Sequence, residues 1–170
     1  MKIIFTAIAL FLFSASSFSQ MKDTLYWTSC YKLRWDDFQG TPDTALPYEA
    51  LTFSGIECKY EFTDTSFTYN VAAFFLRNKS WRMLWADSIA LKHEQLHFDI
   101  SEIFARALTE ELARLIPSRS SLKQDVRDCL KKIIAEKEDM QNLYDEETNF
   151  GRINICQKKW EEKLGTLLNK

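Results

Sequence analysis

The sequence predicts an α+β domain in which an N-terminal antiparallel β-hairpin or sheet is followed by three long helices. Apolar residues alternate in the segment that ends at residue 62, and between residues 88 and 168 they recur with helical spacing. No internal repeat or long linker divides the 170 residues. The composition, with 46% hydrophobic residues, 4 Gly and 3 Pro, is that of one ordinary globular domain.

Residues 1–19 have the features of a secretory signal peptide. A positive start at Met1-Lys2 is followed by an apolar run over residues 3–13, and then by small and polar residues up to a cleavage point before Gln20. A membrane anchor is the competing interpretation, but the run is shorter than the roughly 20 apolar residues that span a bilayer. The sequence therefore predicts an exported protein, periplasmic or extracellular, with a mature chain of residues 20–170 and no membrane span in it.

The β-structure is predicted from two segments joined by a short turn. The first segment is 48–62, the turn is 63–66, and the second strand-like segment is 67–76. One face of the first segment carries alternate apolar residues, namely Ile56, Cys58, Tyr60 and Phe62. Upstream, residues 33–40 are expected to form a short strand or turn that leads into a proline-containing loop.

The three predicted helices cover about residues 88–116, 122–150 and 153–168. Asp87 or Ser88 can cap the first helix, and Pro117 interrupts it. Gly151 is a natural end for the second helix. The first and second helices each carry an apolar stripe at helical spacing, so we expect them to pack against a common core.

Four cysteines lie in the predicted mature chain, where an oxidising compartment permits disulfides. If the last two helices form a hairpin that turns near Phe150, Cys129 and Cys156 lie about 30 and 9 Å from the turn at about 1.5 Å per residue. These distances are too unequal for a disulfide. We therefore favour a bond between Cys30 and Cys58.

An HExxH motif, His93-Glu94-Gln95-Leu96-His97, stands in the first predicted helix and contains both histidines of the chain. Histidines four residues apart lie about 40° from each other around a helix, so both imidazoles can reach one zinc ion. Glu94 flanks the metal and can take a proton from water that the metal has made more acidic. The alternative is a helix that carries two histidines by chance, which we expect in on the order of one in several hundred chains of this length.

The residues around this motif resemble a family of exported bacterial proteins, domain of unknown function 922, described as predicted secreted zinc-dependent proteases. The resemblance lies in HEQLHFDISEIFAR at residues 93–106, in Ser80-Trp81, in the WDDF core of residues 33–40, and in YDEET at residues 144–148. It spans most of the mature chain. It implies a single zincin-like metalloprotease domain over residues 20–170 with an active-site helix, and it implies no particular substrate.

One position departs from the family pattern, whose late motif reads Tyr-Asp-x-x-Thr-x-His and whose histidine is implied to be a third zinc ligand. Phe150 stands in that place here. Phenylalanine cannot coordinate zinc, and a catalytic zinc normally has three protein ligands. The site must therefore recruit another ligand, bind zinc weakly, or be inactive. Glu146 and Glu147, four and three residues before Phe150, are the nearest substitutes. Their alternative role is that of a solvated acidic patch.

Other polar residues near the two motifs are weaker candidates. Asp145 or Tyr144 could orient a metal-bound histidine or stabilise an oxyanion. Glu102 lies about 180° around the helix from His93, so we expect it to pair with Arg106 on the surface.

The charge balance excludes nucleic acid as a partner. The chain has 22 Lys and Arg residues against 24 Asp and Glu residues, a net charge of −2, and so lacks an excess of positive charge that would hold a phosphate backbone. The function that we infer from the sequence is a secreted zinc-dependent metallohydrolase, a peptidase acting on a peptide or protein substrate. In it His93 and His97 bind Zn²⁺ and Glu94 is the general base. The alternative is a catalytically degenerate zincin scaffold that acts as an envelope or secreted binding protein.

Overall fold

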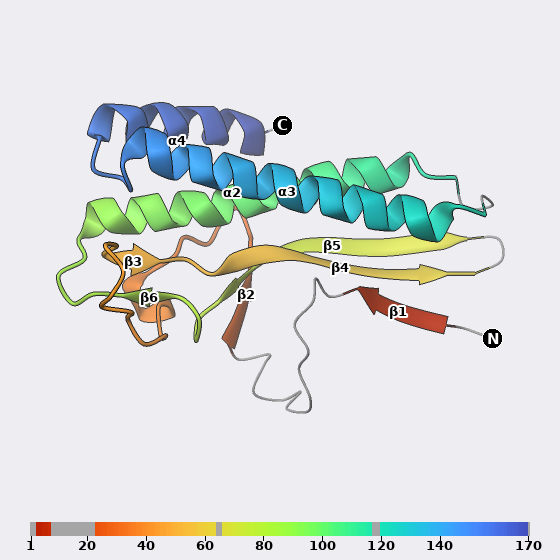
Figure 1. Ribbon diagram of the computed structural model, residues 1–170, viewed down its shortest axis with the longest axis horizontal. Helices are drawn as coiled ribbons and strands as arrows, with labels where there is room; N and C mark the ends of the chain where they lie inside the picture. Colours follow the sequence, from red (N-terminus) through yellow and green to blue (C-terminus); the bar gives the residue numbers. More distant parts are fainter. Residues whose placement is uncertain (1–2, 8–22, 64–65, 117–119, 170) are drawn as a thin grey trace.

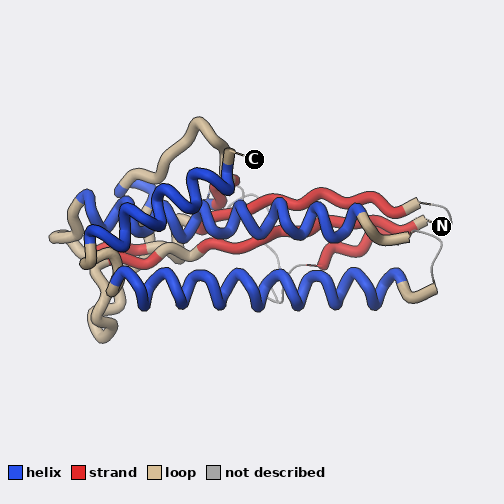
Figure 2. The backbone as a smooth tube through the Cα atoms, turned by 90° about the horizontal axis from the view of Figure 1, so that it is seen from above, coloured by secondary structure: helices blue, strands red, loops and turns tan. Residues whose placement is uncertain are grey.

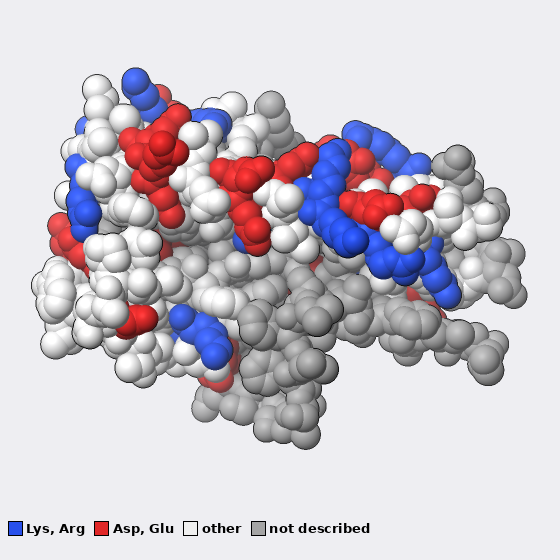
Figure 3. All heavy atoms as spheres, in the orientation of Figure 1, with Lys and Arg blue, Asp and Glu red and all other residues white. Residues whose placement is uncertain are grey.

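The computed structural model describes residues 3–7, 23–63, 66–116 and 120–169 (Figure 1). It is α+β, as the sequence predicts, with the strands first and three long helices after them. The helices lie over one face of the main sheet and run along the same direction as its two long strands (Figures 1 and 2). On the face drawn in Figure 3, acidic and basic side chains are interspersed over the helices.

The main sheet has the strand order β1-β4-β5-β2, and all its neighbours are antiparallel. Its centre is the predicted hairpin of β4 (Ser54–Phe62) and β5 (Phe67–Leu76), whose register runs from Ser54 opposite Phe75 to Phe62 opposite Phe67. Strand β2 (Thr24–Tyr26) pairs with the far end of β5. The alternating pattern of the first segment thus predicted the strand and its inward face.

Strand β1 (Ile3–Ala7) comes from the segment that the sequence predicts to be a signal peptide. It pairs with β4 at the edge of the sheet, with Ile3 opposite Phe62. The remainder of that segment, residues 1–2 and 8–19, lies outside the described residues. Cleavage before Gln20 would remove β1 and leave β4 as the edge strand.

A second sheet of two short strands lies near the start of the first long helix. It pairs β3 (Ala50–Leu51) with β6 (Trp81–Arg82). The predicted short strand or turn upstream is a 3-10 helix, η1 (Trp35–Asp37). Its buried Asp37 accepts hydrogen bonds from the Tyr31 hydroxyl and from Arg77 Nε, and so ties this turn to the end of β5.

The three predicted helices are present as α2 (Ser88–Ala113), α3 (Leu122–Thr148) and α4 (Asn154–Leu168). Asp87 caps α2 by accepting hydrogen bonds from the backbone of Ile89 and Ala90. Helix α2 ends a few residues earlier than predicted. It packs directly on β4 and β5, and both other helices pack on α2. None of the helices in the described ranges combines the length and the hydrophobicity that a bilayer crossing requires.

Helix α2 is the centre of the molecule because it has neighbours on nearly every side. All residues from His93 to Ser101 are buried, which is typical of a helix enclosed between a sheet and other helices. One apolar cluster joins α2 to α3, α4 and Cys58 of β4, and a second joins it to β5 and to the segment around Leu33. The HExxH motif therefore lies inside the domain rather than on its surface.

The expected disulfide between Cys30 and Cys58 is wrong, because all four cysteines are free thiols. Cys30 is exposed, whereas Cys58 is buried in the core cluster beneath the helices. Burial raises the pKa of the Cys58 thiol to about 11, and neighbouring Glu57 adds to this shift. Cys30 lies in the loop after β2, and β5 stands between β2 and β4, the strand that carries Cys58.

Candidate metal centre

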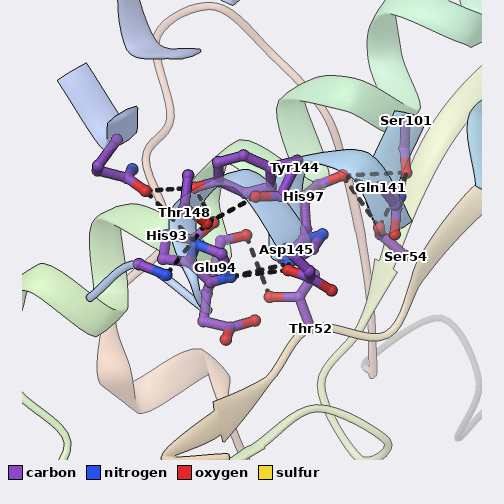
Figure 4. Close-up of polar contacts among 12 residues, drawn as sticks. Thr52, Ser54, His93, Glu94, His97, Ser101, Gln141, Tyr144, Asp145 and Thr148 are labelled. Carbon is purple, nitrogen blue, oxygen red and sulfur yellow. Dashed lines mark hydrogen bonds and ion pairs between the residues drawn. The ribbon is translucent and has the colours of Figure 1, made fainter. Parts of the chain in front are cut away.

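Three side chains from two helices converge at one point. Asp145 Oδ1 of α3 lies 3.0 Å from His93 Nε2 and 3.0 Å from His97 Nε2, both of α2. The two Nε2 atoms are 3.2 Å apart. Figure 4 shows the three side chains pointing toward one another across the contact between the helices. Within the described part of the chain, these three residues form a group whose side-chain atoms lie close enough together to bind one metal ion.

The spacing of these atoms suits a tetrahedral metal ion. Ligand atoms about 2.0 to 2.1 Å from a tetrahedral zinc are roughly 3.4 Å from one another, slightly farther apart than the atoms of this cluster. The chemistry also fits, because two imidazoles and one carboxylate are a common ligand set for catalytic zinc. The His93 and His97 side chains are 5% and 11% exposed, whereas that of Asp145 is 28% exposed, so the cluster opens to solvent on the Asp145 side.

The electrostatics of the cluster favour a positive charge at its centre. Burial alone would raise the pKa of Asp145, but hydrogen bonds with His93 and His97 outweigh burial and hold that pKa well below its usual value. Burial would lower the pKa of His97, but its hydrogen bond to Asp145 and the negative charge of Glu94 raise it. A bound cation would take the place of the proton that these groups share.

The ring of His93 is held by three contacts that leave its Nε2 facing the cluster. Its Nδ1 lies 3.4 Å from the side-chain carbonyl oxygen of Gln157 on α4, an acceptor that favours a proton on Nδ1 when Nε2 binds a metal. Tyr144 stacks on the ring at 4.5 Å and donates its hydroxyl to the same Gln157 oxygen at 2.7 Å. A Cβ at Gly151, whose φ is +78°, would lie 3.0 Å from the Cβ of His93, so only glycine fits there.

The backbone of α2 at the motif is tied to the neighbouring elements by side-chain hydrogen bonds. Thr52, in the link between β3 and β4, donates to the carbonyl of Glu94 at 3.1 Å. Ser54 of β4 and Gln141 of α3 both donate to the carbonyl of His97 at 3.4 Å. The sheet and α3 therefore fix the depth and rotation of α2 at the point from which both imidazoles project (Figure 4).

Glu94 is buried beside the cluster without being part of it. Glu94 is 5% exposed, and its Oε2 atom has no hydrogen-bond partner among the described residues. A buried carboxylate oxygen without a partner is costly unless something binds to it. Glu94 also lines the cavity described next, so this carboxylate lies at the boundary between the cavity and the core.

A cavity of about 430 Å³ has the three converging side chains in its lining. Its lining also includes residues 48–52, the first turns of α2, and residues 150–152 with Asn154. Its volume lies within the usual range for pockets that bind small molecules or short peptide segments. The cluster is therefore reachable from outside, as a catalytic site requires.

The structure brings together some of the residues singled out in the sequence and separates others. His93, Glu94 and His97 share the cavity, but Glu146 and Glu147 are exposed and are absent from the ligand cluster. Glu147 instead accepts a hydrogen bond from the indole of Trp160 at 2.8 Å. The expected pair of Glu102 and Arg106 is present, with 2.9 Å between Nε and Oε1.

Asp145 is the third member of the cluster of potential ligands, whereas the sequence predicts for it a role in orienting a histidine or stabilising an oxyanion. Glu146 and Glu147 would share a helical face with Phe150 only if the helix were continuous. Helix α3 ends at Thr148, and residues 149–151 all have positive φ, so Phe150 does not share a helical face with residues three and four positions earlier. The buried pair Tyr144 and Thr148, four residues apart, marks the face of α3 that meets α2. That spacing was the signal that could have pointed to the adjacent Asp145.

The comparisons with known proteins give one match. Residues 70–151 match the model of a family described as bacterial protein of unknown function, DUF922. The matched segment contains α2 and α3, and with them His93, Glu94, His97 and Asp145, but it ends before Gln157 on α4. No curated protein and no solved structure matches the chain.

Proposed function

We propose that this protein is an exported zinc metallohydrolase that cleaves peptide bonds, with His93, His97 and Asp145 as the protein ligands of the ion and Glu94 as the general base. The observation that carries the proposal is the convergence of three ligand atoms within 3.0 to 3.2 Å of one another in a cavity that Glu94 also lines. The family model covers all four of these residues, and the description of the family names no activity.

The division of roles follows from the position of each group. A zinc ion, when bound, would supply a Lewis acid that polarises a carbonyl oxygen and makes water more acidic. Glu94 Oε2 is the group that would accept a proton from the attacking water and pass it to the departing amide nitrogen. The water oxygen then joins the acyl carbon as the carbon–nitrogen bond breaks, which gives a carboxylic acid and an amine.

The ligand set by itself is also that of non-haem iron enzymes, which use two histidines and one carboxylate. Glu94 favours the hydrolase, because a buried carboxylate beside the ligands supplies the base that water attack needs. The complete set of three ligands also favours the hydrolase over the degenerate scaffold, since the reason to expect degeneracy was the lack of a third ligand at Phe150.

The direct test is metal analysis of the purified protein. We expect one zinc ion per chain by elemental mass spectrometry after growth with iron, manganese and zinc all supplied. A His97→Ala variant should lose the ion, and a Glu102→Gln variant, which changes a carboxylate elsewhere on the same helix, should keep it. Iron in place of zinc, or no stoichiometric metal, would reject the zinc site.

A second expectation concerns Gln157, which holds the Nδ1 side of His93. Gln157→Leu should weaken zinc binding by about 10- to 100-fold, because groups that orient a ligand have effects of this size. Gln157→Glu keeps an acceptor at Nδ1 and should bind zinc far more tightly than Gln157→Leu. Competition with a chromophoric chelator measures both affinities. The exposed Gln124 of α3 offers a control, as Gln124→Leu should leave the affinity unchanged. Equal affinities in the Leu and Glu variants at position 157 would contradict the role of Gln157.

Export is proposed from residues 1–19 alone. Intact-mass measurement of protein recovered from the native cell envelope or the medium should give a chain that begins at or near Gln20. Mature soluble protein that retains Met1 or Lys2 would overturn the proposal. A mature chain that keeps its first residues would keep β1 paired with β4, whereas cleavage before Gln20 removes β1. The same measurement therefore decides whether the mature sheet has four strands or three.

A further inference from the structure

Phe150 has an unfavourable backbone conformation that core packing does not explain. Its φ is +55°, between Asn149 at +46° and Gly151 at +78°. Asn and Gly adopt left-handed conformations readily, but a bulky side chain does so rarely. Phe150 is 38% exposed and belongs to neither apolar core cluster, so packing in the core does not compensate the strain. Strained residues of this kind concentrate where a ligand is held.

The ring of Phe150 forms part of the cavity that contains the metal cluster. It contacts the ring of Tyr48, which also lines the cavity, with 4.9 Å between centroids and a tilt of 45°. A second contact joins the same two segments, since Arg152 donates to the carbonyl of Pro47 at 3.2 Å. The two rings are therefore braced in place beside the cluster, and neither belongs to the two apolar core clusters.

We propose that Tyr48 and Phe150 form a subsite for an aromatic side chain of a peptide whose adjoining carbonyl lies at the metal cluster. This inference rests on the proposed function, because that function places a peptide in the cavity. It names a substrate class, peptides with an aromatic residue next to the bond that is cleaved.

The walls around the two rings agree with such an occupant. Ala50, Leu51, Ile89 and Ala90 add an apolar lining of small and medium side chains to the same cavity. A third ring can stack against the solvent-accessible side of these partly buried rings in an offset or edge-on geometry, and such contacts add attraction beyond the area that they bury. The cavity of about 430 Å³ has room for one such ring together with the adjoining backbone.

The test uses a probe that has the ring and no metal-binding group. We expect 3-phenylpropanamide to shift the NMR signals of Tyr48 and Ile89 in the full mature chain, and to bind at least about tenfold more tightly than propanamide. Phe150→Asn removes the ring and suits the left-handed backbone, so the variant should fold. It should lower the affinity for 3-phenylpropanamide by about three- to tenfold, the ratio that corresponds to one aromatic contact.

The control is Ile155→Asn, which makes a similar change at a 68% exposed residue of α4 that does not line the cavity. Its affinity for the probe should equal that of the parent protein. Equal binding of the two amides, shifts elsewhere on the surface, or equal losses in both variants would overturn the subsite.

The experiment is run with metal-free and with zinc-loaded protein, and zinc content is measured on the same samples. Probe binding that depends on Phe150 in protein that takes up no zinc would support the subsite and reject the metal centre. Zinc uptake without any preference for the ring would keep the metal centre and reject the subsite. In the zinc-loaded protein, 3-phenylpropanohydroxamate should bind at least about tenfold more tightly than acetohydroxamate, and this preference should fall in Phe150→Asn.

Discussion

Asp145→Asn is expected to lower the affinity for zinc by more than 100-fold. The amide keeps the size of the side chain but loses the negative charge that faces His93 Nε2 and His97 Nε2 at 3.0 Å. Removing a ligand should cost more than the roughly 10- to 100-fold loss that follows when only a supporting group is changed. Competition with a chelator of known affinity measures the change directly.

The neighbouring acids provide the matched controls for this substitution. Glu146→Gln and Glu147→Gln remove the same charge from the same helix turn, but both residues are exposed and lie outside the cluster. We expect each to bind zinc within about threefold of the parent, since an exposed charge is well screened by solvent. If either of them released the ion while Asp145→Asn retained it, the third ligand would be the acid that the sequence argument first suggested.

Glu94→Gln is expected to keep zinc and to lose hydrolysis by about 10²- to 10⁴-fold, the range that a positioned general base contributes. The amide preserves the shape of a residue that is 5% exposed, and it removes the lone pair on Oε2 that would accept the proton. A mixed peptide library is incubated with parent and variant at equal zinc content. Mass spectrometry of the products then measures cleavage at whichever peptide bonds the protein accepts.

The control for this experiment is Glu102→Gln, on the same helix but paired with Arg106 at the surface. Its cleavage pattern and rate should match those of the parent. If Glu94→Gln cleaved the library as fast as the parent, Glu94 would not be the base. If it lost zinc, Glu94 would be needed to build the site rather than to move a proton.

Much of the fold was predictable because the signals for it are local. The alternation that ends at Phe62, the turn over residues 63–66 and the helical stripes each depend on neighbours a few positions away, and the structure has β4, β5 and all three helices where they were predicted. The HExxH motif is local in the same sense, since a spacing of four residues places His93 and His97 on one side of α2 whatever surrounds it.

The failures concern relations between distant segments. The pairing of Cys30 with Cys58 was wrong because one thiol is exposed and the other faces the core, and strand order decides this. Gln157 was not considered because its role depends on how α4 packs against α2, 64 residues away in sequence. No periodicity within one segment carries such information.

By itself, then, the sequence determined the central hairpin, the three helices, the histidine pair and the acid beside it, because each depends on a local pattern of residues. Only the tertiary structure decided which acid faces the histidines. Successive residues of a helix point about 100° apart, so the choice among Asp145, Glu146 and Glu147 depends on the rotation of α3 about its own axis. The ring of Tyr144 packs on both imidazoles of α2, which sets that rotation and directs the carboxylate of the adjacent Asp145 to the same two rings.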